Sequence, residues 1–119
     1  MAYIDGFLLA VPTANKEAYR AMAEKAAPIF LDHGALRCVE TWGDDVPDGK
    51  VTDFRMAVKA TPEETVVFSW IVWPSKEVRD AGMKGFMEDP RVEEMTEMPF
   101  DGQRMMFGGF APLVDIGTE

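Results

Sequence analysis

The most strongly strand-forming segment of the chain is Thr65-Val66-Val67-Phe68-Ser69-Trp70-Ile71-Val72-Trp73. Ser69 is the only polar residue between Val66 and Trp73, and β-branched or aromatic residues, which favour strands, fill the other positions. A continuous apolar run of this length predicts a strand that is buried on both faces. Pro74 ends the run, and Ser75 is placed to cap a following helix.

A second helix and a last strand follow this segment. The helix is expected to run to about Glu88, and its apolar side includes Gly82 and Gly85. Each glycine costs a helix about 1 kcal/mol relative to alanine, so we expect the pair to permit close contact with the sheet. Asp89-Pro90 predicts a short helix to about Met95. The last strand is predicted over Arg104–Val114, where Gly108-Gly109 indicates a bulge or a close backbone approach.

The same order of elements precedes the central segment. Tyr3–Val11 is an apolar run that ends at Pro12 and predicts a strand. A helix follows with Asn15 or Thr13 as its cap. Its apolar face repeats at helical spacing and consists of Tyr19, Met22, Ala26, Ile29 and Phe30. Pro28 predicts a kink rather than a break, and His33 with Gly34 predicts the end of the helix.

A second strand and an irregular connection complete the first half. Ala35–Gly43 alternates between apolar and polar residues, which predicts a half-buried strand, with Glu40 on the same side as Cys38 and Trp42. Residues 44–64 carry turn residues and form a connection. Around Phe54–Val58 this connection is expected to include a short strand or a single helical turn.

The order strand, helix, strand, connection, strand, helix, strand predicts an α+β fold. Val11-Pro12 before the first helix corresponds to Trp73-Pro74 before the second, so the chain reads as two similar halves. This repeat favours a ferredoxin-like βαββαβ arrangement with one antiparallel sheet, in a single domain over residues 1–119. An open α/β sheet is the alternative.

An unusually apolar sheet also predicts a homodimer. Two helices can cover only one face of a four-stranded sheet, yet the third strand is apolar on both faces. The uncovered face would then exceed the few hundred Å² of contiguous apolar surface that monomers usually expose. A second copy placed sheet to sheet would cover it. The alternative is that residues 44–64 fold over the open face.

Composition disfavours several classes of partner. Twelve basic and 21 acidic residues leave a net charge of −9, and the basic residues are scattered, so nucleic acid, an RNA-related role and anionic membranes are poor partners. No segment approaches the roughly 20 apolar residues of a membrane span. The single Cys38 and the absence of a basic N-terminal region favour a cytoplasmic protein.

The sequence contains no motif for a metal or a cofactor. It has no histidine pair, cysteine pair or glycine-rich phosphate loop, so we expect neither a metal nor a bound cofactor. Asp44, Asp45 and Asp48 suggest a calcium loop, but Val46 and Arg55 occupy positions where that loop needs ligands. The acidic group is therefore expected to be a solvated turn.

Four residues are candidates for a small-molecule site: Asp5, His33, Trp42 and Trp70. His33, the only histidine, is the best candidate for a catalytic residue, as a general base, or else a hydrogen-bond anchor; the alternative is a side chain that satisfies the carbonyls at a helix end. The two tryptophans could form an aromatic wall or simply fill the core. Cys38 is expected to be a packing residue.

Asp5 is an acidic residue in the middle of an apolar strand. An unpaired carboxylate there would be costly. It could face the open edge of the sheet, pair with Arg104 or Arg37 across strands, or face a polar pocket together with His33.

The chain resembles the DUF1428 family of small bacterial proteins. The resemblance covers nearly the whole chain and rests on Tyr3-Ile4-Asp5-Gly6-Phe7, Ala18-Tyr19-Arg20-Ala21-Met22-Ala23, His33-Gly34-Ala35-Leu36, Gly43-Asp44-Asp45-Val46, Glu64-Thr65-Val66-Val67-Phe68-Ser69-Trp70-Ile71-Val72 and Met98-Pro99-Phe100-Asp101-Gly102-Gln103-Arg104-Met105. It implies a dimeric α+β barrel, a fold shared by cofactor-free monooxygenases, haem-degrading enzymes and small binding proteins. It implies no particular activity.

Three functions remain open from the sequence. The first is a protein that binds a small apolar or aromatic molecule between helix and sheet, in a cavity of at least about 300 Å³ with a few convergent polar groups. The second is a non-catalytic interaction or stress-associated dimer with a large dry interface, above roughly 2,000 Å². The third, a cofactor-independent monooxygenase-like enzyme, rests on fold analogy alone.

Overall fold

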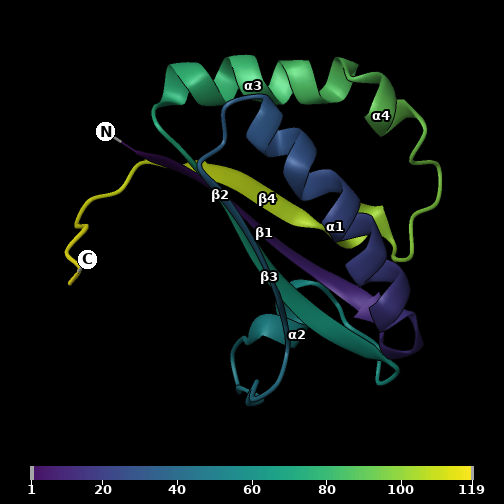
Figure 1. The fold of residues 1–119 in the computed structure, drawn as a ribbon. Helices are drawn as coiled ribbons and strands as arrows, with labels where there is room; N and C mark the ends of the chain where they lie inside the picture. Colours follow the sequence, from purple (N-terminus) through teal and green to yellow (C-terminus); the bar gives the residue numbers. More distant parts are fainter. Residues whose placement is uncertain (1, 119) are drawn as a thin grey trace.

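The computed structural model describes residues 2–118 and shows a four-stranded sheet with two long helices on one face (Figure 1). The strands are β1 (Tyr3–Pro12), β2 (Arg37–Trp42), β3 (Glu64–Trp73) and β4 (Met106–Phe110). The helices are α1 (Lys16–Asp32), α2 (Phe54–Ala57), α3 (Lys76–Glu88) and α4 (Pro90–Glu93), with single 3-10 turns η1 (Thr13–Asn15) and η2 (Gly102–Arg104).

The sheet has the order β2-β3-β1-β4, and all neighbouring strands are antiparallel. The central pair, β1 and β3, is in register from Tyr3 opposite Trp73 to Pro12 opposite Glu64. This is the ferredoxin-like βαββαβ arrangement that the repeated halves predicted. The alternative of an open α/β sheet is wrong, since that fold requires mostly parallel strands.

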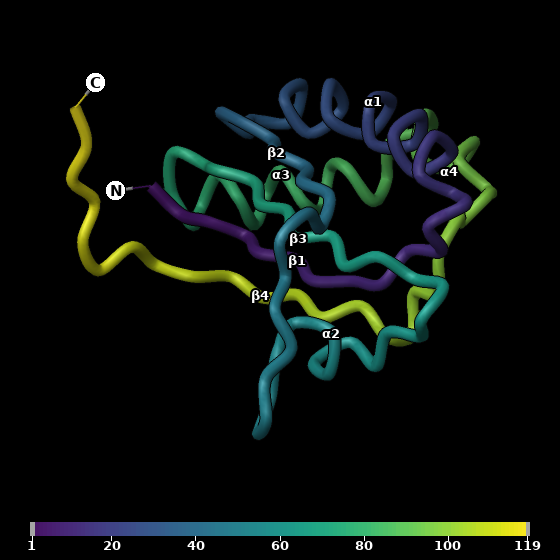
Figure 2. Tube along the Cα trace, turned by 90° about the horizontal axis from the view of Figure 1, so that it is seen from below, coloured from purple at the N-terminus to yellow at the C-terminus, as the bar shows by residue number. Residues whose placement is uncertain are grey.

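The core lies between the sheet and the two long helices. Side chains alternate along each strand, so one face of β1 and β3 contributes buried residues such as Leu9, Val67 and Trp73 beneath α1 and α3. Figure 2 shows α1 and α3 on one side of the sheet and α2 on the other. Val58, just after α2, packs against Ala10 and Val66, so that these three residues are buried at one end of the second face.

The rest of the second face is open in the single chain. Phe68 is 48% exposed and Phe110 is 61% exposed. The prediction that the third strand is buried on both faces is therefore wrong for the single chain except at its first residues. The alternative, that residues 44–64 fold over the open face, holds for one end of it only. Around Phe54–Val58 the predicted short excursion is the helical turn α2.

Helix ends confirm some of the predicted caps and correct others. The Ser75 hydroxyl accepts a hydrogen bond from the backbone N–H of Val78 and caps α3, and the Asp89 carboxylate caps α4. Asn15 makes no side-chain cap; its amide group donates instead to the carbonyl oxygen of Pro99 at 3.0 Å. Because this long-range bond replaces the cap, Asn15 ties the start of α1 to the segment before β4.

The end of α1 follows the predicted pattern. The helix continues through Pro28 to Asp32, His33 is the capping residue, and Gly34 has a φ of 106°. The following strand is shorter than expected and begins at Arg37. The last strand is also shorter than predicted, because Arg104 lies in η2 rather than in β4.

Glycines give α3 and β4 the close contacts that the sequence indicated. A Cβ added at Gly82 would lie 2.5 Å from the carbonyl oxygen of His33 and 2.8 Å from Cη2 of Trp73. At Gly109 it would lie 2.7 Å from Nη2 of Arg79. Gly109 stays in register opposite Asp5, so the glycine pair allows close approach rather than forming a bulge.

Candidate functional site

An apolar cavity of about 260 Å³ lies between α1 and the helix-covered face of the sheet. Its walls come from β1, β3, α1, the end of α3 and residues 92–105. Most of the lining side chains are apolar: Phe7, Leu9, Met22, Ala23, Ala26, Phe30, Ile71, Phe86, Val92, Met95, Met98, Phe100 and Met105. The volume is slightly below the 300 Å³ that the sequence-based hypothesis required.

Tyr19, Glu40 and Ser69 lie together on the wall of this cavity, and Glu97 is the fourth polar residue that lines it. Tyr19, in the first turns of α1, donates its hydroxyl proton to Oε1 of Glu40 at 2.6 Å. Glu40, in β2, lies directly opposite Ser69 of β3 in the strand register. Tyr19 and Ser69 are both buried, whereas Glu40 is exposed to solvent. The three groups therefore place one carboxylate at the edge of an apolar space.

Burial and mutual proximity change the acidity of these groups. Desolvation raises the pKa of Glu40, and hydrogen bonds from Tyr19 and Ser69 oppose that rise. Desolvation, together with the neighbouring carboxylate of Glu40, raises the pKa of Tyr19 well above its ordinary value. Tyr19 is thus a firmly protonated donor, while Glu40 is an acceptor whose affinity for a proton is increased. Solvent access limits the size of the change at Glu40.

Cys38 is close to the same carboxylate. Desolvation, and secondly the charge of Glu40, raise the pKa of its thiol to about 11. The Sγ atom lies 4.0 Å from the carbonyl oxygen of Ala27 in α1. A thiol with this pKa is protonated at neutral pH and is a poor nucleophile, in agreement with a packing role.

Two hollows adjoin the cavity. One of about 330 Å³ lies between α1 and β2 and shares Tyr19, Ala23 and Glu40 with it, so the Tyr19–Glu40 pair separates the two spaces. A groove of about 660 Å³ lies between α1 and residues 94–99. It shares Met22, Met95, Glu97 and Met98 with the cavity, so the side chains that close the cavity also line this outer groove.

His33 does not line this cavity. Its Nε2 atom lies 2.8 Å from Oδ2 of Asp89, the residue that caps α4, and its ring packs against Gly85. Arg91 also donates to Asp89 and reaches Asp32 at 2.8 Å. The side chain of His33 thus joins the end of α1 to the α3–α4 junction, while its backbone N–H donates to carbonyls of α1.

Asp5 is buried in an ion pair that the sequence did not identify. Its carboxylate accepts hydrogen bonds from Arg79 of α3, the shortest at 2.8 Å, and from the indole N–H of Trp73 at 2.9 Å. The proposed partners Arg104 and Arg37 are therefore wrong: Arg104 binds Glu64, and Arg37 lies on the exposed edge strand β2. A position on the open edge is also wrong, since Asp5 is 3% exposed.

The two candidate tryptophans lie on opposite faces of the sheet. Trp42 is on the helix-covered face, where Lys16 Nζ lies 5.6 Å from its ring centroid, and it lines the hollow beside β2. Trp70 is on the open face and packs against Phe68 with ring centroids 5.4 Å apart. A single aromatic wall containing both residues is therefore not formed.

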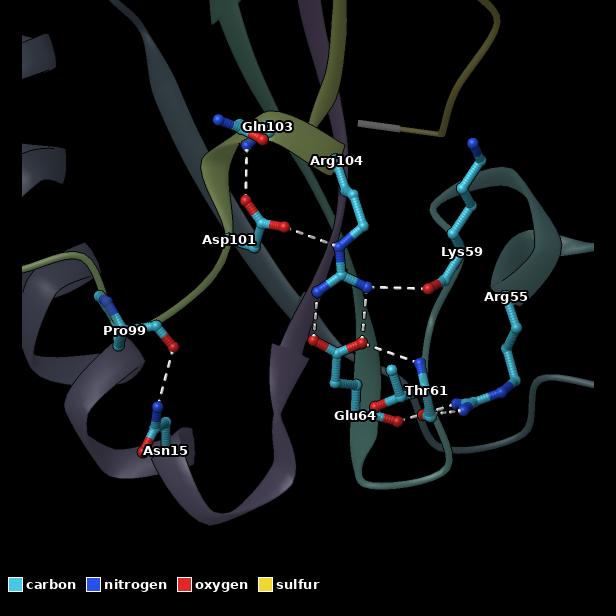
Figure 3. Close-up of polar contacts among 9 residues, drawn as sticks. All are labelled: Asn15, Arg55, Lys59, Thr61, Glu64, Pro99, Asp101, Gln103 and Arg104. Carbon is cyan, nitrogen blue, oxygen red and sulfur yellow. Dashed lines mark hydrogen bonds and ion pairs between the residues drawn. The ribbon is translucent and has the colours of Figure 1, made fainter.

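A polar cluster holds the segment that closes one end of the cavity (Figure 3). Arg104 binds both carboxylate oxygens of Glu64 at 2.6 and 2.8 Å, and it also donates to the carbonyl of Lys59. Asp101 accepts from Arg104 at 3.0 Å. These bonds anchor η2 to the start of β3, and thereby position Phe100 and Met105, which line the cavity.

The sequence analysis did not predict the Tyr19–Glu40 pair, although it placed each of the two residues on an apolar face. Tyr19 belongs to the apolar face of the predicted helix, and Glu40 is the acidic residue on the apolar side of the predicted strand. A polar residue on an apolar face usually has a partner in space. The sequence could not show that these two positions face each other.

Among residues 2–118 no group of three or more histidine, cysteine or acidic side chains is placed to hold a metal ion. In the same part of the chain, no helix has the length and apolar character needed to cross a membrane.

Comparisons with known proteins identify close relatives and more distant structural neighbours. A family model described as "Protein of unknown function (DUF1428)" matches residues 2–102. The "Uncharacterized protein YbaA" of Escherichia coli K12 is 64% identical over 116 residues, covering 97% of this chain and 99% of that protein. The protein of the same name from Shigella flexneri matches equally well.

Two solved structures share the fold at low sequence identity. One is a mutant of SnoaB, described as a cofactor-independent oxygenase from Streptomyces nogalater, with a TM-score of 0.59 and 14% identity over 98% of each chain. The other is described as a dimeric ferredoxin-like protein from an uncultured marine organism, with a TM-score of 0.53 and 12% identity over 98% of each chain. At this identity the likeness establishes the fold alone.

Proposed function

The chain belongs to the DUF1428 family, and on that premise we propose that it is a homodimeric protein that binds a compact, mostly apolar molecule beneath α1. The observation that carries the proposal is the 260 Å³ apolar cavity, whose polar lining consists of Tyr19, Glu40, Ser69 and Glu97. A few convergent polar groups in an apolar pocket are the usual composition of a small-molecule site.

The size of the cavity limits the ligand. An engineered apolar cavity of about 150 Å³ is large enough to hold benzene. A volume of 260 Å³ therefore accommodates one substituted ring or two fused rings. Larger ligands would need movement of residues 94–99, because Met95, Glu97 and Met98 line both the cavity and the outer groove.

Ligand binding is tested by calorimetry and thermal shift with one- and two-ring aromatic compounds. Ala26, on the cavity wall, offers a matched control, because leucine at this position would fill part of the space. We expect compounds that raise the unfolding midpoint of the unchanged protein to lose that effect in Ala26→Leu. Binding that is unaffected by Ala26→Leu would place the ligand elsewhere and contradict the proposal.

The open face of the sheet supports the homodimer. Phe68, Met106 and Phe110 are each about half exposed or more, and they lie around the partly buried Trp70. One structural neighbour is described as dimeric. A second copy stacked on this face would remove the patch from water without obstructing the cavity, because the cavity lies on the opposite face.

The dimer is tested by sedimentation velocity. Phe68→Asp places a charge at the centre of the open face, and we expect it to yield monomers. Met87, which is 67% exposed on α3, provides the control Met87→Asp, for which a dimer is expected. A monomeric unchanged protein at micromolar concentration would refute this part of the proposal.

A cytoplasmic location is supported by the lone cysteine, which needs no oxidising compartment. Fractionation of cells that produce the protein at its natural level tests this. Recovery from an oxidising compartment would contradict it.

A second candidate function is a cofactor-independent oxygenase. The favouring observation is that Glu40, whose pKa is raised, borders an apolar space in a fold that resembles an oxygenase. Such a carboxylate could remove a proton from an electron-rich hydroxyarene, whose anion would then react with O₂. Oxygen consumption with such compounds, abolished by Glu40→Gln, would support this candidate; no consumption above the spontaneous rate would exclude it for those compounds.

A further inference from the structure

Resting on the function proposed above, we infer that the cavity selects aromatic ligands that carry a hydrogen-bond donor, with Glu40 as their anchor, and rejects carboxylates.

The two charged side chains in the wall of the cavity itself are both acidic. Glu40 and Glu97 are the ionisable acids in its wall, and among the side chains that line it within residues 2–118 there is no lysine, arginine or histidine. A ligand carboxylate would therefore enter an apolar space with two like charges and no counter-ion, which is unfavourable.

The polar groups offer a ligand a hydrogen-bond acceptor rather than a donor. A carboxylate can accept about four hydrogen bonds. Glu40 accepts one from Tyr19 at 2.6 Å and interacts with Ser69, so it retains lone pairs for a further partner. The hydroxyl proton of Tyr19 is already directed to this carboxylate. The ligand must then supply the proton of any new hydrogen bond to Glu40.

The apolar walls favour a flat ligand. Phe30 and Phe86 stack with ring centroids 3.8 Å apart and planes 3° apart, and Phe100 packs edge-on against Tyr19 at 5.8 Å. Aromatic rings favour such stacked and edge-on contacts with other rings, and methionine side chains such as Met22 adapt to fill the remaining space. The ligand class is therefore a one- or two-ring aromatic that bears a hydroxyl or an N–H group.

Three indoles test this inference on the unchanged protein by calorimetry at pH 7. 3-Methylindole and 1-methylindole are isomers of equal size, but only the first has an N–H group. A hydrogen bond to a charged group corresponds to about tenfold or more in affinity, and solvent access of Glu40 favours the lower end. We expect 3-methylindole to bind about tenfold more tightly than 1-methylindole, and indole-3-carboxylate not to bind.

The variant Glu40→Gln, which is nearly isosteric, tests the anchor. It removes the charge and presents an amide, so we expect the ratio between the two isomers to fall to about threefold or less, and indole-3-carboxylate to gain affinity. Equal binding of the two isomers by the unchanged protein, or a ratio unchanged in Glu40→Gln, would overturn this inference while leaving a binding cavity in place. Binding of none of the three would overturn both this inference and the proposed ligand site.

Discussion

The carboxylate of Asp5 and the guanidinium of Arg79 form a two-pronged ion pair beneath α3, in which Nη2 donates to Oδ1 at 2.8 Å and Nε donates to Oδ2 at 3.1 Å. The indole N–H of Trp73 donates a further bond to the same carboxylate. This arrangement satisfies a charge that is almost completely buried in β1, and it fixes α3 on the sheet.

Removing Arg79 should be strongly destabilising. Arg79→Met leaves the buried carboxylate of Asp5 with only Trp73, and we expect the free energy of unfolding to fall by about 3–5 kcal/mol. Urea unfolding at fixed protein concentration measures this. Arg20, which pairs with Glu17 on the exposed surface of α1, provides the control: Arg20→Met should change stability by less than about 1 kcal/mol. Equal effects of the two substitutions would refute the role of the buried pair.

The architecture could be predicted from sequence because it follows from local signals. Pro12 and Pro74 end strands, Gly34 ends a helix, and Ser75 begins one. Each signal acts within a few residues of its position, so it can be read along the chain.

Side-chain partners could not be predicted in the same way. For Asp5 the sequence left a paired, an exposed and a pocket-facing position open. Its partner Arg79 is 74 residues away, and the approach of Arg79 depends on the rotation of α3 on the sheet. The same holds for His33: the sequence placed it at a helix end and Asp89 at a helix start, yet only packing brings them to 2.8 Å. The cavity was expected between helix and sheet, but its polar residues depended on such packing.

The ion pair between Glu64 and Arg104 should make stability fall in acid. The hydrogen bond from Arg104 lowers the pKa of Glu64 from 4.5 to about 2. A depressed pKa in the folded state contributes stability above pH 4.5, and this contribution is lost as the pH falls from 4.5 towards 2. We expect Glu64→Gln to be about 1–3 kcal/mol less stable at pH 7, and the difference from the unchanged protein to shrink across that interval.

Urea midpoints of both proteins between pH 7 and pH 2.5 provide the measurement. Asp115, an exposed residue near the C-terminus that forms no ion pair within the described residues, provides the control. The urea midpoint of Asp115→Asn should equal that of the unchanged protein at every pH. A difference between Glu64→Gln and the unchanged protein that stays constant down to pH 2.5 would contradict the proposed acid dependence.

Cys38 should react slowly at neutral pH. Desolvation and the neighbouring Glu40 raise the pKa of its thiol to about 11, and alkylation requires the thiolate. The alkylation rate of the folded protein with iodoacetamide should therefore continue to rise above pH 10. In urea-unfolded protein the rate should level off near the ordinary thiol pKa of about 8.5. Identical pH profiles in the two states would show that the folded environment does not protect the thiol.

Gly82 lies where α3 meets the sheet, and replacing it with alanine should destabilise the protein although alanine is the better helix former. Helix propensity alone predicts a gain of about 1 kcal/mol. The added Cβ would, however, lie 2.5 Å from the carbonyl oxygen of His33 and 2.8 Å from Cη2 of the fully buried Trp73, neither of which can move freely. Overpacking of this kind costs about 1–3 kcal/mol, and we expect Gly82→Ala to be destabilising by that amount.

Ala81, next to Gly82, allows the effect of helix propensity to be measured separately from the effect of overpacking. Ala81 is exposed, so Ala81→Gly should show the propensity term alone, with a loss of about 1 kcal/mol. Both variants are then destabilised although their substitutions run in opposite directions, which propensity alone cannot produce. Chemical unfolding of the two single variants decides the matter, because a Gly82→Ala protein that is more stable than the unchanged chain would mean that α3 can move away from Trp73 without cost.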